Sequence, residues 1–181
     1  MGPVIEQPDL SQPASSPARP NLLRAWWPAV VWIGLIGVES TDWLSSNNTG
    51  SLLYDILVRI YPRINLYDVL VLNFYMRKTG HVVGYGMLSL LLLRAWRATL
   101  AHGVAVGRSI FGSATFLRAA LFAWLGTAFV ASMDEWHQTF IPSRTGSVYD
   151  VLLDSAAGFV SLLIAYFWLR RLNSPSLRPK T

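Results

Sequence analysis

The sequence predicts an all-α integral membrane protein: a bundle of four transmembrane helices with an amphipathic interfacial segment between the first and the second. The 181 residues are 52% hydrophobic and only 14% charged, whereas soluble domains carry about 25% charged residues. The mean hydropathy is +0.37. The apolar residues fall into four blocks, at residues 22–38, 79–93, 119–133 and 151–169. Eight Trp and seven Tyr suit the two membrane–water boundaries.

Composition also excludes several kinds of site and partner. The chain has no Cys, which rules out disulfides, thiolate metal ligands and a Cys nucleophile. The net charge of +5 does not indicate nucleic acid, because the basic residues are scattered at the ends of apolar blocks and no nucleic-acid motif is present. We therefore expect membrane lipids, and no nucleic acid, as partners.

The chain divides into two tails and one domain. Residues 1–21 contain five of the ten prolines together with Ser and Gln, which predicts a disordered cytoplasmic tail. Residues 22–170 form the transmembrane domain. In its first block Pro28 stands in the first turns, where a missing N–H costs least, and Glu39 ends the helix. Residues 171–181 form a basic cytoplasmic tail.

The segment between the first two blocks is polar and amphipathic. Residues 47–50 (NNTG) predict a turn. Residues 52–60 repeat apolar side chains at helical spacing, and residues 66–76 are too short and too polar to span. They predict one or two helices on the membrane surface; an ordinary packed loop is the alternative. The link at residues 94–118, between blocks two and three, is basic and rich in Gly and Ser.

The distribution of Lys and Arg predicts the orientation. With the N-terminus inside, ten basic residues lie on the inner side and five on the outer side, and eight of the ten acidic residues lie at or near the outer side. The positive-inside rule then places both termini in the cytoplasm. The inner residues are Arg19, Arg24, Arg94, Arg97, Arg108, Arg118, Arg170, Arg171, Arg178 and Lys180; the outer ones are Arg59, Arg63, Arg77, Lys78 and Arg144.

The length of the blocks predicts the depth of the polar residues. The second and third blocks are 15 residues long, whereas a spanning helix needs about 20. Each must therefore include about one turn of its polar flank, residues 77–79 and 134–138 on the outer side. The true loop between the third and fourth blocks is then about residues 139–148. The polar side chains are expected one helical turn below the outer boundary, facing inward.

Helical spacing groups these side chains into stripes. Arg77, His81 and Tyr85 are spaced i, i+4, i+8 on the second helix. Asp134 and Gln138 share a face of the third. The fourth carries Asp150, Asp154 and Gly158 on one face, where the glycine permits close approach.

These stripes predict a polar pocket that binds a ligand near the outer leaflet. Opposite charges that only hold the helices in register are the structural alternative. Arg77, Lys78 and Arg144 suit an anionic group, and the other members suit hydroxyls or amines. The ligand-binding candidates are Arg77, Lys78, His81, Tyr85, Asp134, Glu135, Gln138, Arg144, Asp150 and Asp154.

The sequence leaves catalysis open. His81 with Asp134 or Glu135 could act as an acid–base pair, so these three are the catalytic candidates. No compact ligand motif such as H-E-x-x-H occurs, so we assign no metal and no cofactor, although His81, Asp134, Glu135, His137 and Asp150 have suitable chemistry. The sequence does not predict the oligomeric state.

Two motifs in the chain resemble the VanZ-like family of bacterial membrane proteins. The match covers about residues 24–168, and Asp154 departs from it because Asn is common at that position. The resemblance implies a four-helix protein of the bacterial cytoplasmic membrane and cell envelope. The first motif is Arg77-Lys78-x-x-His81-x-x-x-Tyr85. The second is Asp134-Glu135-x-x-Gln138-x-Phe140-x-Pro142-x-Arg144, followed by Asp150-x-x-x-Asp154-x-x-x-Gly158.

Three functions are compatible with these features. The first is a membrane protein that binds an anionic headgroup or a lipid-linked cell-wall precursor. The family is named for a protein associated with low-level teicoplanin resistance, so the resemblance also implies a link to glycopeptide tolerance. The second is an intramembrane hydrolase or transferase acting on lipid-linked envelope precursors. The third is a small transporter or flippase.

Overall fold

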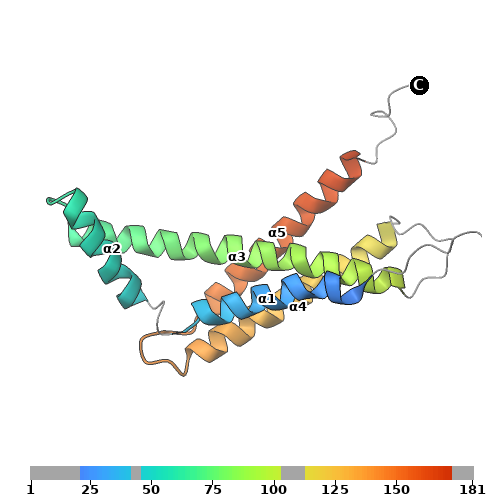
Figure 1. Ribbon diagram of the computed structural model, residues 1–181, viewed down its shortest axis with the longest axis horizontal. Helices are drawn as coiled ribbons and strands as arrows, with labels where there is room; N and C mark the ends of the chain where they lie inside the picture. The colour runs from blue at the N-terminus through green and yellow to red at the C-terminus, as the bar shows by residue number, and fades with distance from the viewer. Residues whose placement is uncertain (1–20, 42–45, 103–112, 173–181) are drawn as a thin grey trace, which may run out of the picture.

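The computed structural model describes residues 21–41, 46–102 and 113–172, and these residues form an all-α structure. Five helices account for nearly all of them (Figure 1). Of the expected tails at residues 1–21 and 171–181, only residues 21, 171 and 172 are described, and residues 171–172 are helical; the other tail residues lie outside the described residues. The helices are α1 (Leu22–Glu39), α2 (Ser46–Ile60), α3 (Leu66–His102), α4 (Ser113–Gln138) and α5 (Val148–Leu172).

Three of the helices are long and apolar enough to cross a membrane: α1, α4 and α5. They correspond to the first, third and fourth apolar blocks. Only about a fifth of each candidate span is buried inside the protein, so most of its apolar side chains face outward, as expected for contact with lipid. The helix ends agree with the sequence: Glu39 is the last residue of α1, and α4 includes the polar residues up to Gln138.

Helix α3 departs from the expected arrangement. Residues 66–76 do not form a separate surface helix, and residues 94–102 are not a loop, because both continue the second apolar block as one helix of 37 residues. This segment has no proline, and its glycines weaken a helix without ending it. Because α3 contains a polar stretch, it is not among the candidate membrane spans of the described residues. The predicted bundle of four spanning helices is therefore not confirmed.

The expected turn at residues 47–50 is also wrong, because these residues form the first turn of α2. Two contacts explain the change. The Ser51 hydroxyl donates to the carbonyl of Asn48 at 3.0 Å, and the Thr49 hydroxyl donates to the side chain of Asn73 on α3 at 3.2 Å. Tertiary packing thus overrides the turn propensity of Asn and Gly. Leu52 and Ile56 remain exposed on α2, so its placement on a membrane surface stays a prediction.

Helix α3 is the centre of the packing. It contacts each of the other four helices, and α4 also packs against α5. Leu88 and Leu92 of α3 meet alanines of α4 in the core. Two indole N–H groups tie α1 to α3: Trp26 donates to Thr99 and Trp32 to the carbonyl of Gly84, each at 2.9 Å. The N-terminal part of α3 extends beyond the other helices, and α2 folds back beside it (Figure 1).

Candidate functional site

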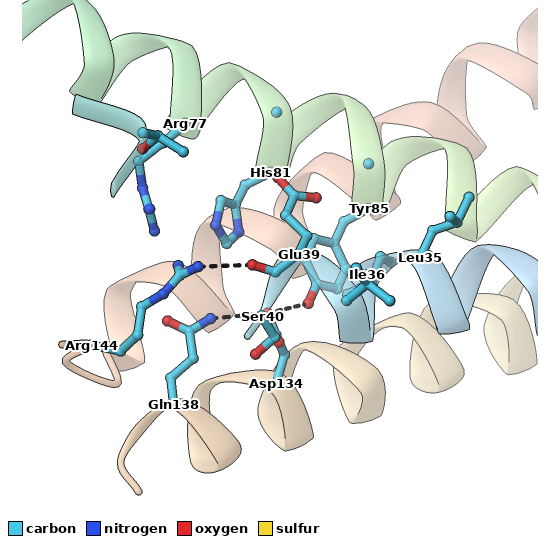
Figure 2. Close-up of a pocket in the computed structure, with 14 residues that line it drawn as sticks. Leu35, Ile36, Glu39, Ser40, Arg77, His81, Tyr85, Asp134, Gln138 and Arg144 are labelled. Atoms are coloured by element: carbon cyan, nitrogen blue, oxygen red, sulfur yellow. Dashed lines mark hydrogen bonds between the residues drawn. The ribbon is translucent and has the colours of Figure 1, made fainter. Parts of the chain in front are cut away.

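A pocket of about 340 Å³ lies where the C-terminal ends of α1 and α4 meet the middle of α3 (Figure 2). The apolar part of its lining comes from α1. The polar part comes from the end of α1, Thr49 of α2, α3, α4 and the loop between α4 and α5. The lining residues are Leu35, Ile36, Val38, Glu39, Ser40, Thr49, Arg77, Gly80, His81, Gly84, Tyr85, Asp134, Gln138 and Arg144.

The three residues of the α3 stripe all line this pocket. Arg77, His81 and Tyr85 are spaced by one helical turn each, so they point to the same side of α3 (Figure 2). The rings of His81 and Tyr85 stack with their centroids 6.1 Å apart. Arg77, His81 and Tyr85 therefore lie in a row along one side of the pocket.

Hydrogen bonds join this stripe to α4. The Tyr85 hydroxyl donates to Asp134 Oδ2 at 2.9 Å. The Gln138 side-chain amide donates to the same oxygen at 3.3 Å (Figure 2). One oxygen of Asp134 is thus held by two donors, which fixes the orientation of this carboxylate.

Arg144 closes one side of the pocket from the loop at residues 139–147. Its guanidinium donates through Nη2 to the carbonyl of Glu39 at 2.8 Å and to that of Thr41 at 3.0 Å. Glu39 is the last residue of α1, where C=O groups have no partner within the helix, and Thr41 follows two residues later. Arg144 is only 9% exposed, so it links the loop to α1 while its side chain lines the pocket.

Four other predicted site residues do not line the pocket. They form a second layer between α3, α4 and α5. Lys78 pairs with Asp150 in a partly exposed ion pair. Asp154 is fully buried and bonds His81 Nδ1 through Oδ2 at 3.1 Å. Glu135 accepts a hydrogen bond from the backbone N–H of Ser147 at 2.7 Å.

Two residues of this second layer, together with His81 of the pocket wall, form the one set of possible metal ligands found in the described helices and loops. One ligand atom from each of His81, Glu135 and Asp154 lies within 4.8 Å of the others. The residues come from α3, α4 and α5 and are far apart in the sequence. The motifs that resemble the VanZ-like family include all three residues, but their spacing does not show that these three side chains converge.

Sequence reasoning missed the contribution of α1 and α2 to the pocket. Ser40 and Thr49 line it, although Thr49 was assigned to a turn. The buried Ser40 hydroxyl lies 3.3 Å from His137 Nδ1. Three apolar side chains of α1 also face the pocket, and in the sequence they are indistinguishable from lipid-facing residues. Glu39 was the only lining residue of α1 that the sequence singled out.

The fold and this polar layer define a multi-pass, all-α membrane protein whose polar side chains are gathered near one end of its apolar helices. The VanZ/LLP1 family profile matches residues 25–169, and the chain belongs to this family. Neither a curated protein nor a solved structure matches the chain.

Proposed function

We propose that the pocket binds the anionic headgroup of a membrane lipid or of a lipid-linked envelope precursor. The observation that supports this most is the division of the pocket lining. Leu35, Ile36 and Val38 form an apolar side, and Arg77 and Arg144 bring two guanidinium groups to the polar side. A lipid has the same division between its acyl chain and its headgroup.

The polar side suits a phosphate with hydroxyl or amine substituents. Arg77 supplies a guanidinium that can hold two phosphate oxygens in bidentate geometry. Glu39, Asp134 and Gln138 supply oxygens that accept from hydroxyls or amines. The volume of about 340 Å³ is at the lower end for small-molecule sites, about 300–1,000 Å³, so it suits a headgroup better than a whole lipid.

The location of the pocket supports access from a membrane surface. Apart from those of α2 and α3, its residues belong to the C-terminal end of α1, the last turns of α4 and the loop at residues 139–147. These are the ends of two candidate spans. With both termini in the cytoplasm, as positive-inside counting predicts, this end faces the outer leaflet of the bacterial cytoplasmic membrane.

Lipid titration tests the proposal. The full chain, purified in a neutral detergent, is titrated with short-chain phosphatidylglycerol and with phosphatidylcholine, and binding is measured by native mass spectrometry. We expect phosphatidylglycerol to bind, and Arg77→Ala to weaken it by about 10-fold or more, because a charge-assisted hydrogen bond contributes about 1.5–3 kcal/mol. Arg77→Lys keeps the positive charge but is expected to lose the part of the affinity that depends on bidentate hydrogen bonds to the phosphate.

Arg59→Ala is the matched control, because Arg59 is exposed on α2 and does not line the pocket. It should bind phosphatidylglycerol like the wild type. Equal binding by Arg77→Ala and Arg59→Ala would rule the pocket out as the headgroup site. If the binding holds, teicoplanin tolerance is the phenotype to measure in cells that carry Arg77→Ala.

A second candidate function is hydrolysis or group transfer on such a lipid. It is favoured by the hydrogen bond between His81 and Asp154. His81 lines the pocket while a buried carboxylate orients its ring, the arrangement that prepares a histidine for acid–base chemistry. This candidate predicts product formation by the wild type, and loss of turnover with retained lipid binding in His81→Gln. If no envelope lipid gives a product, the catalytic function is ruled out and lipid binding remains as the proposed function.

A further inference from the structure

We propose that His81, Glu135 and Asp154 bind one divalent transition-metal cation, with zinc as the best match, between α3, α4 and α5. This site lies behind the polar wall of the pocket, and it is a different site from the headgroup pocket proposed above. Of its three residues only His81 also lines the pocket.

The geometry is close to that of a metal site. Since the three ligand atoms lie within 4.8 Å of one another, an ion at their centre would be about 2.8 Å or less from each. Zinc binds imidazole nitrogen and carboxylate oxygen at about 2.0–2.2 Å. Each side chain therefore has to move by less than about 1 Å, which a change of side-chain torsion can supply. The helix backbones can stay in place.

Both carboxylates have an oxygen that no other group of the structure satisfies. Glu135 Oε1 and Asp154 Oδ1 are buried and have no hydrogen-bond partner. Glu135 is 4% exposed and Asp154 is fully buried, so solvent does not satisfy these oxygens either. Buried acceptors without a partner cost free energy and are uncommon in native structures. A cation bound between the carboxylates would satisfy them.

The charge balance leads to the same conclusion. Two carboxylates within reach of one imidazole carry a formal charge of −2, which a divalent cation neutralises. Lys78 is the nearest cation of the second layer, and it is already paired with Asp150. Isolated carboxylates are expensive to bury among transmembrane helices.

The residues around the site hold the ligands in place. Glu135 Oε2 accepts from the N–H of Ser147 at 2.7 Å, which fixes the carboxylate and leaves Oε1 available. Outer contacts of this kind orient the ligands of known metal sites. Three ligands of the N/O type also leave one coordination position open, as in catalytic zinc sites. Of the three ligands, His81 also lines the pocket.

Metal analysis of the full chain tests the inference. The protein is purified in detergent, stripped with a chelator, incubated with Zn²⁺ and desalted, and bound zinc is measured by mass spectrometry of the elements. We expect about one zinc per chain for the wild type and less than about 0.2 for His81→Ala and for Asp154→Asn. Asp154→Asn preserves the shape of the side chain and removes its charge.

Two control variants are available in the same chain. His137→Ala removes an exposed histidine of α4, and Asp68→Asn removes an exposed carboxylate in the first turn of α3. Both are expected to keep about one zinc per chain. Wild-type protein with less than about 0.2 zinc, or equal zinc in the wild type and His81→Ala, would overturn the inference.

A measurement on the wild type covers the case in which a variant does not fold. X-ray absorption at the zinc edge is expected to give a nitrogen and oxygen ligand set with one imidazole. A set with no imidazole, or with two or more, would contradict the proposed ligands. The lipid titration is read out separately, so failure of headgroup binding and failure of zinc binding are distinguishable.

Discussion

Gly146 lies where the loop at residues 139–147 passes directly over the end of α4, and its replacement by alanine should destabilise the protein. A Cβ at this position would lie 2.4 Å from the backbone oxygen of Glu135 and 2.6 Å from the Thr139 side chain. Ordinary contact begins at 3.4 Å, so a shift of 3.4 − 2.4 = 1.0 Å is required. The obstacle is helix backbone and cannot rotate away.

Overpacking of this kind costs about 1–3 kcal/mol. The shift also strains the 2.7 Å hydrogen bond from the Ser147 N–H to the Glu135 carboxylate. We therefore expect Gly146→Ala to lower the free energy of unfolding by about 1–3 kcal/mol. For a chain of this size that corresponds to a fall in Tm of roughly 2–12 °C.

Thermal unfolding in detergent, followed by circular dichroism, measures the effect. Gly34→Ala is the matched control, because a Cβ at Gly34 of α1 meets nothing within 4 Å. It should leave Tm unchanged or raise it, since alanine is the better helix former. The reasoning is refuted if Gly146→Ala unfolds within about 1 °C of the wild type, or if Gly34→Ala is destabilised equally.

Three further predictions concern the packing of α5 and the orientation of the chain. Gly158→Leu should prevent close packing of α3, α4 and α5, because a Cβ there already approaches Thr127 at 3.0 Å and Ser89 at 3.3 Å; a variant with wild-type Tm would contradict this. A double-mutant cycle on Lys78→Met and Asp150→Asn should give a coupling of no more than about 1 kcal/mol, since both side chains are partly exposed; a coupling above about 3 kcal/mol would place the pair in a dry interior. A reporter that is active only in the cytoplasm should be active when it is fused to the C-terminus. Activity of a reporter that works only outside the cytoplasm would reverse the proposed orientation.

The sequence predicted the ends of the helices well where polar residues follow an apolar block. Glu39 and Gln138 end α1 and α4 as expected, because the apolar run and the tight loop after it limit each helix. The prediction was wrong for α3, where low hydropathy was taken as the end of the helix. Polar residues lower the mean hydropathy without breaking a helix, so hydropathy alone could not show that residues 66–102 are continuous.

The sequence also predicted which side chains of one helix share a face, because helical spacing determines this. It could not predict the partners between helices. His81 bonds Asp154, whereas Tyr85, one turn further along α3, bonds Asp134. That choice depends on the rotation and depth of α4 and α5 relative to α3. The contacts of Arg144 with backbone carbonyls of α1 carry no sequence signal at all.

The length of α3 has a mechanical consequence. Its 37 residues make a rod of about 55 Å, which is longer than the hydrocarbon core of about 30 Å. Leu66, near α2, lies about 22 Å along this rod from His81. A tilt of about 5° at His81 therefore moves Leu66 by about 2 Å, and the reverse also holds. A displacement of α2, which packs against this end of α3, is thereby coupled geometrically to His81 in the wall of the pocket.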